Sequence, residues 1–187
     1  MKILIVDNYD SFTYNLVHLS EQFADEILVM RNDEIDFSII DQYDKIILSP
    51  GPGLPEDAGD LIKVIKEFSS TKSILGVCLG HQALGQVFSL KLRNIKNVKH
   101  GEQSFLTEVD KEETLFHGLY EPIEVGHYHS WVIDETNNFE DWTITGKSKD
   151  LIMSFSHKTL DLKGVQFHPE SVLTPLGKEM LKNWVKS

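Results

Sequence analysis

The first half of the chain alternates short apolar runs with stretches in which apolar residues recur at helical spacing. Apolar runs of this length predict strands that are buried on both faces of a sheet. The four runs are Lys2–Val6, Glu26–Met30, Lys45–Leu48 and Ser73–Val77. Between and after them we expect three helices, one capped by Asp10 or Ser11, one at Asp57–Phe68 and one from Leu79 to about Phe88. This order predicts an α/β fold with an open, mostly parallel mixed sheet and helices on both faces.

The pattern changes after Leu90, where short alternating or β-branched runs are separated by polar turns. Ser104–Val109, Ile123–Tyr128 and Trp142–Thr145 predict further, antiparallel strands that are added to the same domain. Gly177–Lys186 has apolar residues at helical spacing and predicts a closing helix. We find no linker, repeat or low-complexity tract, so residues 1–187 are expected to form a single domain.

Composition and charge narrow the class of protein. Of 187 residues, 41% are hydrophobic and 25% are charged, which is typical of an ordinary globular domain. The 18 Lys and Arg against 29 Asp and Glu give a net charge of −11, which disfavours nucleic acid and anionic membranes as partners. No apolar run is long enough to cross a bilayer, and the first residues lack a signal-type cleavage pattern, so we expect a cytoplasmic protein.

Unusual chemistry follows three of the four predicted strands. The segment Asp7–Asp10 follows the first strand, Ser49–Gly53 the third and Cys78 the fourth. In open α/β sheets, ligands bind outside the carboxyl ends of the strands. We therefore expect these three segments to meet at one edge of the sheet.

Cys78 is the single cysteine, so it forms no disulfide within the chain and belongs to no multi-cysteine metal site. It stands in the pattern Gly76-Val77-Cys78-Leu79-Gly80 at a predicted strand-to-helix junction. That pattern is typical of a nucleophile elbow after a central strand, where the helix amides stabilise a thiolate. The alternative is a small hydrophobic residue in the core.

A thiolate nucleophile needs a base, and His168 directly follows a strand pattern. Pro169 favours an extended conformation at His168, and residues i and i+2 of an extended segment face the same side. Glu170 could then bond the imidazole nitrogen remote from Cys78, the role of the third member of a catalytic triad. The alternative is a histidine at a strand end beside a surface glutamate.

Backbone amides are the expected donors to an oxyanion. One is the amide of Leu79, the residue after the candidate nucleophile. A second could come from the Pro-Gly cluster, where only Gly51 or Gly53 has an amide hydrogen, and we favour Gly53. A plain turn is the alternative explanation of that cluster.

Four ordered motifs resemble those of the class I glutamine amidotransferases over essentially the whole chain. They are SPGPG at 49–53, GVCLGHQ at 76–82, YHS at 128–130 and GVQFHPES at 164–171. The opening segment Asp7–Asn15 resembles more narrowly the glutaminase subunits of anthranilate synthase and of aminodeoxychorismate synthase. The resemblance implies a flavodoxin-like fold and glutaminase activity.

By position, the resemblance implies that Cys78 attacks the side-chain amide of L-glutamine, while His168, oriented by Glu170, protonates the departing ammonia. Ammonia would pass to a large chorismate-binding synthase subunit, with anthranilate synthase as the leading interpretation. No cofactor or metal is expected. The residues that would hold glutamine are Gly51, Pro52, Gly53, Gln82, Ser130 and Trp131.

The chain departs from the resembled family at two positions. His127 stands where the family usually has arginine, so a partner contact there would be weaker or pH dependent. Trp131 replaces leucine beside the expected glutamine pocket. Lys99-His100-Gly101 matches a stretch that we assign either to the partner-facing surface or to a solvated turn.

Three other functions remain open from the sequence. The same chemistry could supply aminodeoxychorismate synthase, or one chain could serve both synthases. A stand-alone cysteine hydrolase or peptidase would be fully active without a partner. A catalytically dead binding subunit would retain the fold without turnover, against which the intact set of Cys78, His168 and Glu170 argues.

Overall fold

A computed structural model describes residues 1–96 and 98–187 of the chain. The described residues form a central eight-stranded sheet in the order β2-β1-β3-β4-β10-β9-β8-β6. Neighbours among the first five strands are parallel, whereas β9, β8 and β6 pair antiparallel. The parallel strands are β1 (Lys2–Asp7), β2 (Glu26–Arg31), β3 (Lys45–Leu48), β4 (Ser73–Val77) and β10 (Leu162–Val165). The antiparallel strands are β6 (Glu108–Val109), β8 (Trp142–Ser148) and β9 (Leu151–His157). This confirms the predicted mostly parallel mixed sheet.

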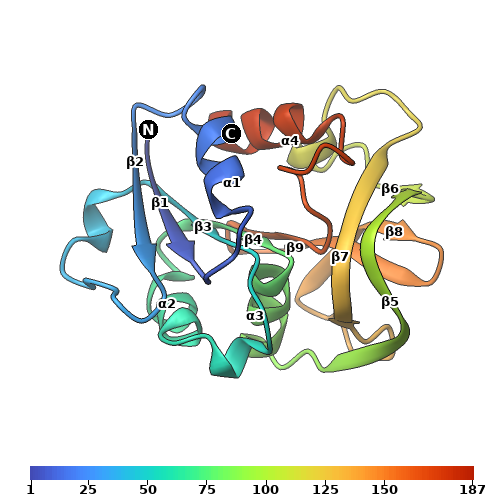
Figure 1. Ribbon diagram of the computed structural model, residues 1–187, viewed down its shortest axis with the longest axis horizontal. Coiled ribbons are helices and arrows are strands. Elements are labelled where there is room, and N and C mark those ends of the chain that lie inside the picture. The colour runs from blue at the N-terminus through green and yellow to red at the C-terminus, as the bar shows by residue number, and fades with distance from the viewer.

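Helices cover both faces of this sheet (Figure 1). Helices α1 (Thr13–Ser20) and α4 (Gly177–Lys186) lie on one face, and α2 (Leu61–Phe68) and α3 (Leu79–Val87) lie on the other. Side chains alternate between the faces, so Ile5 of β1 packs in the core under α1 and α4, whereas Leu4 packs in the core under α2 and α3. The wholly apolar character of the parallel strands follows from this double burial. No helix among the described residues is long and apolar enough to cross a membrane.

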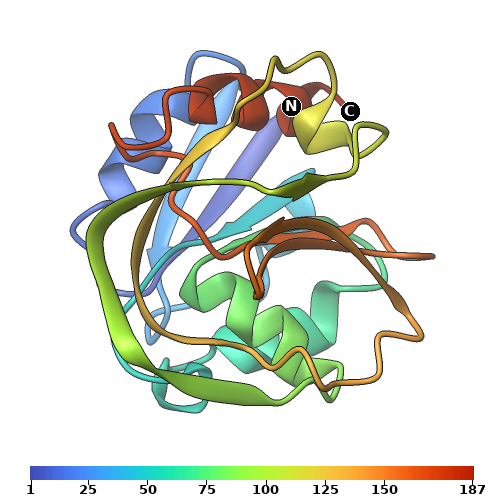
Figure 2. The same cartoon turned by 90° about the vertical axis from the view of Figure 1, so that its right-hand side faces the viewer.

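A second sheet stands beside the first. It consists of β5 (Leu92–Phe105) and β7 (Glu124–Ile133), which pair antiparallel with two shifts of register. Figure 2 shows the two strands as a long curved ribbon that arches over the side of the molecule. The antiparallel strands predicted for the second half are present, but β5 and β7 form a sheet of their own, and the predicted run Ser104–Val109 is divided between β5 and β6.

Two predicted helix starts are wrong. The helix expected from Asp57 begins at Leu61, after the 3-10 turn η2 (Pro55–Asp57), because Gly59 has a φ of +52° that a right-handed helix does not admit. Neither Asp10 nor Ser11 caps the first helix, which begins at Thr13. The Asp10 carboxylate instead accepts a hydrogen bond from the Phe12 amide at 2.8 Å and closes a turn before the helix. The remaining 3-10 turns are η1 (Ile40–Gln42) and η3 (Thr114–Phe116).

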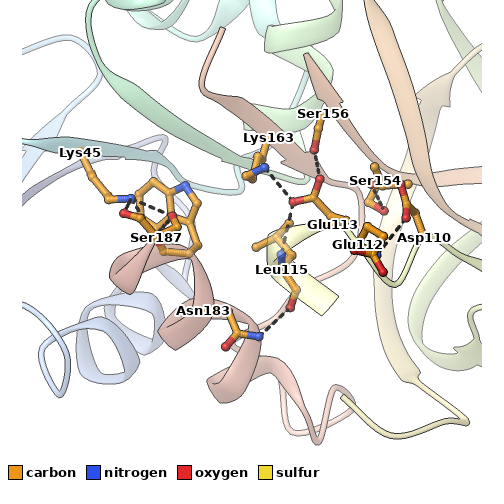
Figure 3. Close-up of polar contacts among 12 residues, drawn as sticks. Lys45, Asp110, Glu112, Glu113, Leu115, Ser154, Ser156, Lys163, Asn183 and Ser187 are labelled. Carbon is orange, nitrogen blue, oxygen red and sulfur yellow. Dashed lines mark hydrogen bonds and ion pairs between the residues drawn. The ribbon is translucent and has the colours of Figure 1, made fainter. Parts of the chain in front are cut away.

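Buried charges hold the amino-terminal edge of the parallel strands (Figure 3). Lys163 of β10 forms an ion pair with Glu113 at 2.8 Å, and Ser156 donates a hydrogen bond to the same carboxylate. Lys45 of β3 donates to the Trp184 carbonyl at 2.7 Å, which ties the end of α4 to the sheet. The segments with unusual chemistry, Asp7–Asp10, Ser49–Gly53 and Cys78, lie at the opposite edge, where the parallel strands end.

Candidate active site

Cys78 occupies the single-residue junction between β4 and α3. Its φ of +50° and ψ of −98° lie in a region that non-glycine residues rarely adopt. A Cβ at Gly80 would lie 2.4 Å from the Leu48 carbonyl oxygen, and one at Gly76 would lie 2.4 Å from the Gly80 carbonyl oxygen. The two glycines therefore let the helix start directly against the strands, which is the elbow geometry predicted from their spacing.

The segments that follow β1, β3 and β4 meet at this edge, as predicted. The Asn8 amide donates to Ser49 Oγ at 2.8 Å, and the Asn8 side chain donates to the Ser49 carbonyl at 2.8 Å. A Cβ at Gly51 would lie 2.6 Å from Asn8 Cβ and 2.7 Å from Leu79 Cδ2. The Pro-Gly segment is thus pressed between the end of β1 and the start of α3.

A cavity of about 150 Å³ opens at Cys78. The residues that the sequence predicts to hold glutamine all line it, together with Tyr128 and His129, to which the sequence assigns no role. Of the two candidate oxyanion donors, Gly53 lines this cavity with a φ of +76°, and Leu79 directly follows Cys78 as the first residue of α3. The predicted lining residues are Gly51, Pro52, Gly53, Gln82, Ser130 and Trp131.

His168 and Glu170 form a buried pair beside the elbow. His168 Nδ1 lies 2.7 Å from Glu170 Oε1, and the two side chains are 2% and 0% exposed. The predicted contact is present, but the chain reaches it through a turn after Pro169 and not through an extended segment. The His168 backbone is fixed as well, since its amide donates to the Gly126 carbonyl at 3.1 Å and its carbonyl accepts from Thr174 Oγ1 at 2.6 Å.

The surroundings of His168 favour its charged form. Burial alone lowers the pKa of His168, but Cys78 and Glu170 together raise that pKa well above its usual value. The rings of Tyr128 and Phe12 lie 4.9 Å and 5.7 Å from the imidazole, centroid to centroid, and cover it from solvent. An imidazolium held beside a sulfur atom and a carboxylate can donate a proton to a leaving group.

Gln166 is a site residue that the sequence did not single out. Its Nε2 lies 3.5 Å from Cys78 Sγ, and its Oε1 accepts from Gln82 Nε2 at 3.1 Å. Gln82 Nε2 also donates to the Trp131 carbonyl at 2.8 Å. Its position in the sequence could have indicated this role, because Gln166 belongs to the same motif as His168 and lies two residues before it.

His127 is not the surface contact that the sequence suggests. It is 2% exposed, and burial lowers its pKa to about 4, so it is neutral near pH 7 and bonds other side chains of this chain. Among the residues that the structure describes, no group of three or more His, Cys, Asp or Glu is placed to hold a metal ion.

A cysteine at a strand-to-helix elbow beside a buried histidine–glutamate pair is the arrangement that enzymes with a cysteine nucleophile use. The family model described as glutamine amidotransferase class-I matches residues 4–187. The chain belongs to the class I glutamine amidotransferase family.

Individual relatives support the family. The chain is 40% identical to the aminodeoxychorismate/anthranilate synthase component 2 of Bacillus subtilis, covering 99% of this chain and 96% of that protein. It is 42% identical to the anthranilate synthase component 2 of Pseudomonas aeruginosa, covering 98% and 94%. A protein from Thermoplasma acidophilum, described as a candidate GMP synthase subunit, has a crystal structure with TM-score 0.87 and 27% identity, covering 100% of this chain and 92% of that chain.

Proposed function

We propose that this chain is a glutaminase subunit that hydrolyses L-glutamine at Cys78 and delivers ammonia to a large chorismate-converting synthase subunit. The observation that carries the proposal is the cavity at Cys78, which gathers six predicted glutamine-binding residues beside the buried His168–Glu170 pair. The names of the relatives from Bacillus subtilis and Pseudomonas aeruginosa support a synthase partner.

In the first half of the reaction, the Cys78 thiolate attacks the side-chain amide carbon of glutamine. The amides of Leu79 and Gly53 donate to the oxyanion, and the His168 imidazolium gives its proton to the amide nitrogen, which leaves as ammonia. The products of this half are the glutamyl thioester and neutral His168. Glu170 holds the imidazole at Nδ1 and leaves Nε2 free for the proton transfers.

In the second half, water attacks the thioester carbonyl and gives a proton to His168 Nε2. The carbon–sulfur bond then breaks, glutamate leaves, and the thiolate–imidazolium pair is restored. The raised pKa of His168 fits this cycle, because the ion pair is the resting state from which the next attack starts.

The partner and the product are tested together. The chain would be co-purified with each large subunit, then assayed for anthranilate and for aminodeoxychorismate. We expect anthranilate, with glutamine turnover that is slow for the chain alone and faster in the presence of chorismate and the large subunit.

The other outcomes identify other functions. Aminodeoxychorismate as the sole product would assign the chain to aminodeoxychorismate synthase. Formation of both products would mean that one chain serves both synthases, as the double name of the Bacillus subtilis relative suggests for that protein. Full glutaminase activity without any partner would indicate a stand-alone hydrolase.

The nucleophile is tested by Cys78→Ser. We expect glutamine-dependent synthesis to fall by roughly 10³-fold or more, while synthesis from added ammonia remains, because ammonia bypasses the thioester. Val172→Ala is a matched control, since Val172 is 92% exposed. An electrophilic glutamine analogue should add one label to each chain and none to Cys78→Ser; retained glutamine-dependent turnover in that variant would refute the mechanism.

A further inference from the structure

A second cavity, of about 400 Å³, lies where β5 and β7 meet the turn between β8 and β9. Its lining includes Ser104, His127 and Ser148, together with both signs of charge: Arg93, Lys99 and Lys149 against Glu102 and Asp150. Among the described residues it shares no lining residue with the cavity at Cys78. We call it the outer cavity.

Four side chains connect the outer cavity with the Cys78 cavity through the interior. Ser148 Oγ lies 2.8 Å from Ser104 Oγ, and Ser104 Oγ lies 2.6 Å from His127 Nε2. His127 Nδ1 lies 3.1 Å from His129 Nε2, and His129 lines the Cys78 cavity. Ser148, Ser104 and His127 line the outer cavity, so the chain of hydrogen bonds begins in one cavity and ends in the other.

The two histidines in this series of hydrogen bonds, His127 and His129, are neutral near pH 7. Burial lowers the pKa of His127 to about 4, with Lys99 and His168 lowering it further and Glu102 opposing them. Burial likewise lowers the pKa of His129 to about 3, with smaller lowering effects from His127 and His168. A neutral imidazole carries one N–H donor and one acceptor nitrogen.

Two neutral rings in this contact must hold the same tautomer. Because His127 Nδ1 and His129 Nε2 share one proton between them, a proton on His127 Nδ1 requires His129 to carry its own at Nδ1. A proton on His129 Nε2 requires His127 to carry its own at Nε2. The hydroxyls of Ser104 and Ser148 then have to follow the same direction of donation.

On the basis of the glutaminase function above, we propose that His127 and His129 are positioning residues of the glutamine cavity, with a shared tautomer that is set from the outer cavity. An acceptor at Ser148, such as a carboxylate or an inorganic anion attracted by Lys149, turns the Ser148 hydroxyl outward; Lys99 is already paired with Glu102 at 2.5 Å. Ser104 then donates to Ser148, His127 donates from Nε2 to Ser104, and His129 donates from Nε2 to His127. The ring of His129 and the adjoining Ser130 backbone are held in one arrangement.

The tautomers are measured directly on the full chain labelled with nitrogen-15, by long-range proton–nitrogen correlation at pH 7. We expect His127 and His129 to be neutral and to hold the same tautomer. Opposite tautomers, or a charged ring at either position, would overturn the proposal. This measurement needs no turnover, so a failure of the glutaminase function would not affect it.

The coupling is tested by Ser104→Ala, which removes the hydroxyl at His127 and does not contact His129. We expect the nitrogen-15 signals of both histidines to move. Ser154→Ala is the matched control, because Ser154 is a buried serine that bonds Thr145 and lies outside the chain of hydrogen bonds. His129 signals that stay fixed in Ser104→Ala, or that move equally in Ser154→Ala, would overturn the coupling.

The effect on the site is tested by His127→Phe and His127→Gln. Phenylalanine keeps a ring but breaks the bonds of His127 to Ser104 and to His129. Because only the bond to His129 reaches the glutamine cavity, we expect the KM for glutamine to rise roughly three- to tenfold, the effect of one lost hydrogen bond. Synthesis from added ammonia should be unchanged, because it does not use this cavity. Glutamine can both donate and accept, and should return the KM toward the parent value. An unchanged KM in the folded His127→Phe variant would overturn the positioning role; if that variant does not fold, the Ser104→Ala spectra decide.

Discussion

The strained backbone at Cys78 makes a prediction about stability that is opposite in sign to the usual effect of glycine. With its φ of +50°, Cys78 occupies a conformation that costs a non-glycine residue about 1–3 kcal/mol. Glycine removes that cost but loses more backbone entropy on folding, about 0.5–1 kcal/mol relative to alanine. The missing methyl group costs up to about 0.8 kcal/mol more. With each contribution at the middle of its range, Cys78→Gly should be more stable than Cys78→Ala by about 1 kcal/mol.

Equilibrium unfolding in urea of the two variants measures this difference, with both lacking the thiol and both inactive with glutamine. Ala83→Gly is the control, because Ala83 is fully buried in the same helix at ordinary helical angles. There we expect a loss of about 1–2 kcal/mol from helix propensity and the lost methyl. At both positions the experiment compares glycine with alanine. If glycine lowered the free energy of unfolding at position 78 as much as it does at position 83, the backbone at Cys78 would carry no strain, and the argument would be refuted.

Three further predictions concern buried titratable side chains. Burial lowers the pKa of His81 to about 3, whereas the same side chain in the unfolded protein takes up a proton below about pH 6.5. The free energy of unfolding therefore decreases as the pH falls below about 6.5. His81→Gln should reduce the dependence of that free energy on pH by about 1.4 kcal/mol per pH unit, measured by urea unfolding between pH 4 and 6. Glu113→Gln removes the charge that pairs with Lys163, whose side chain is 14% exposed, and should cost about 1–3 kcal/mol. A double-mutant cycle with Lys163→Gln should show a coupling between the two positions, whereas additivity would contradict the ion pair. Glu170→Gln should lower kcat with glutamine by about 10²–10⁴-fold. It should also move the alkaline limb of the kcat/KM profile to lower pH, because Glu170 helps raise the pKa of His168 and the reaction starts with His168 protonated; an unmoved alkaline limb would argue against that role.

Much of the fold could be predicted because parallel strands and amphipathic helices carry strong local patterns. Lys45–Leu48, Ser73–Val77 and Gly177–Lys186 have the predicted bounds. The start of α2 was missed because one positive φ at Gly59 outweighs the apolar periodicity around it. The separate sheet of β5 and β7 was missed because alternation of polar and apolar residues identifies a strand without identifying its partner.

Part of the candidate site could likewise be predicted from local sequence patterns, and part could not. Cys78 and the Pro-Gly segment could be predicted because the ends of neighbouring parallel strands must meet at one edge. The contact of Gln166 with Cys78 depends on residues 88 positions apart in the sequence, and local periodicity does not report such a pairing. The His127–His129 contact lies within one strand, but the sequence does not say that both rings are buried and bonded.

The register of two neighbouring strands explains how the candidate nucleophile and its histidine come together. Val77 of β4 pairs with Val165 of β10, and the Cys78 amide donates to the Val165 carbonyl at 2.8 Å. Cys78 therefore lies one residue beyond this pair on the β4 side, and His168 lies three residues beyond it on the β10 side. A slip of β10 by one residue would exchange the faces of its side chains and break the bond to the Cys78 amide. The Lys163–Glu113 ion pair opposes such a slip, because Lys163 lies two residues before Val165 in this short strand and its charge is already matched in the native register.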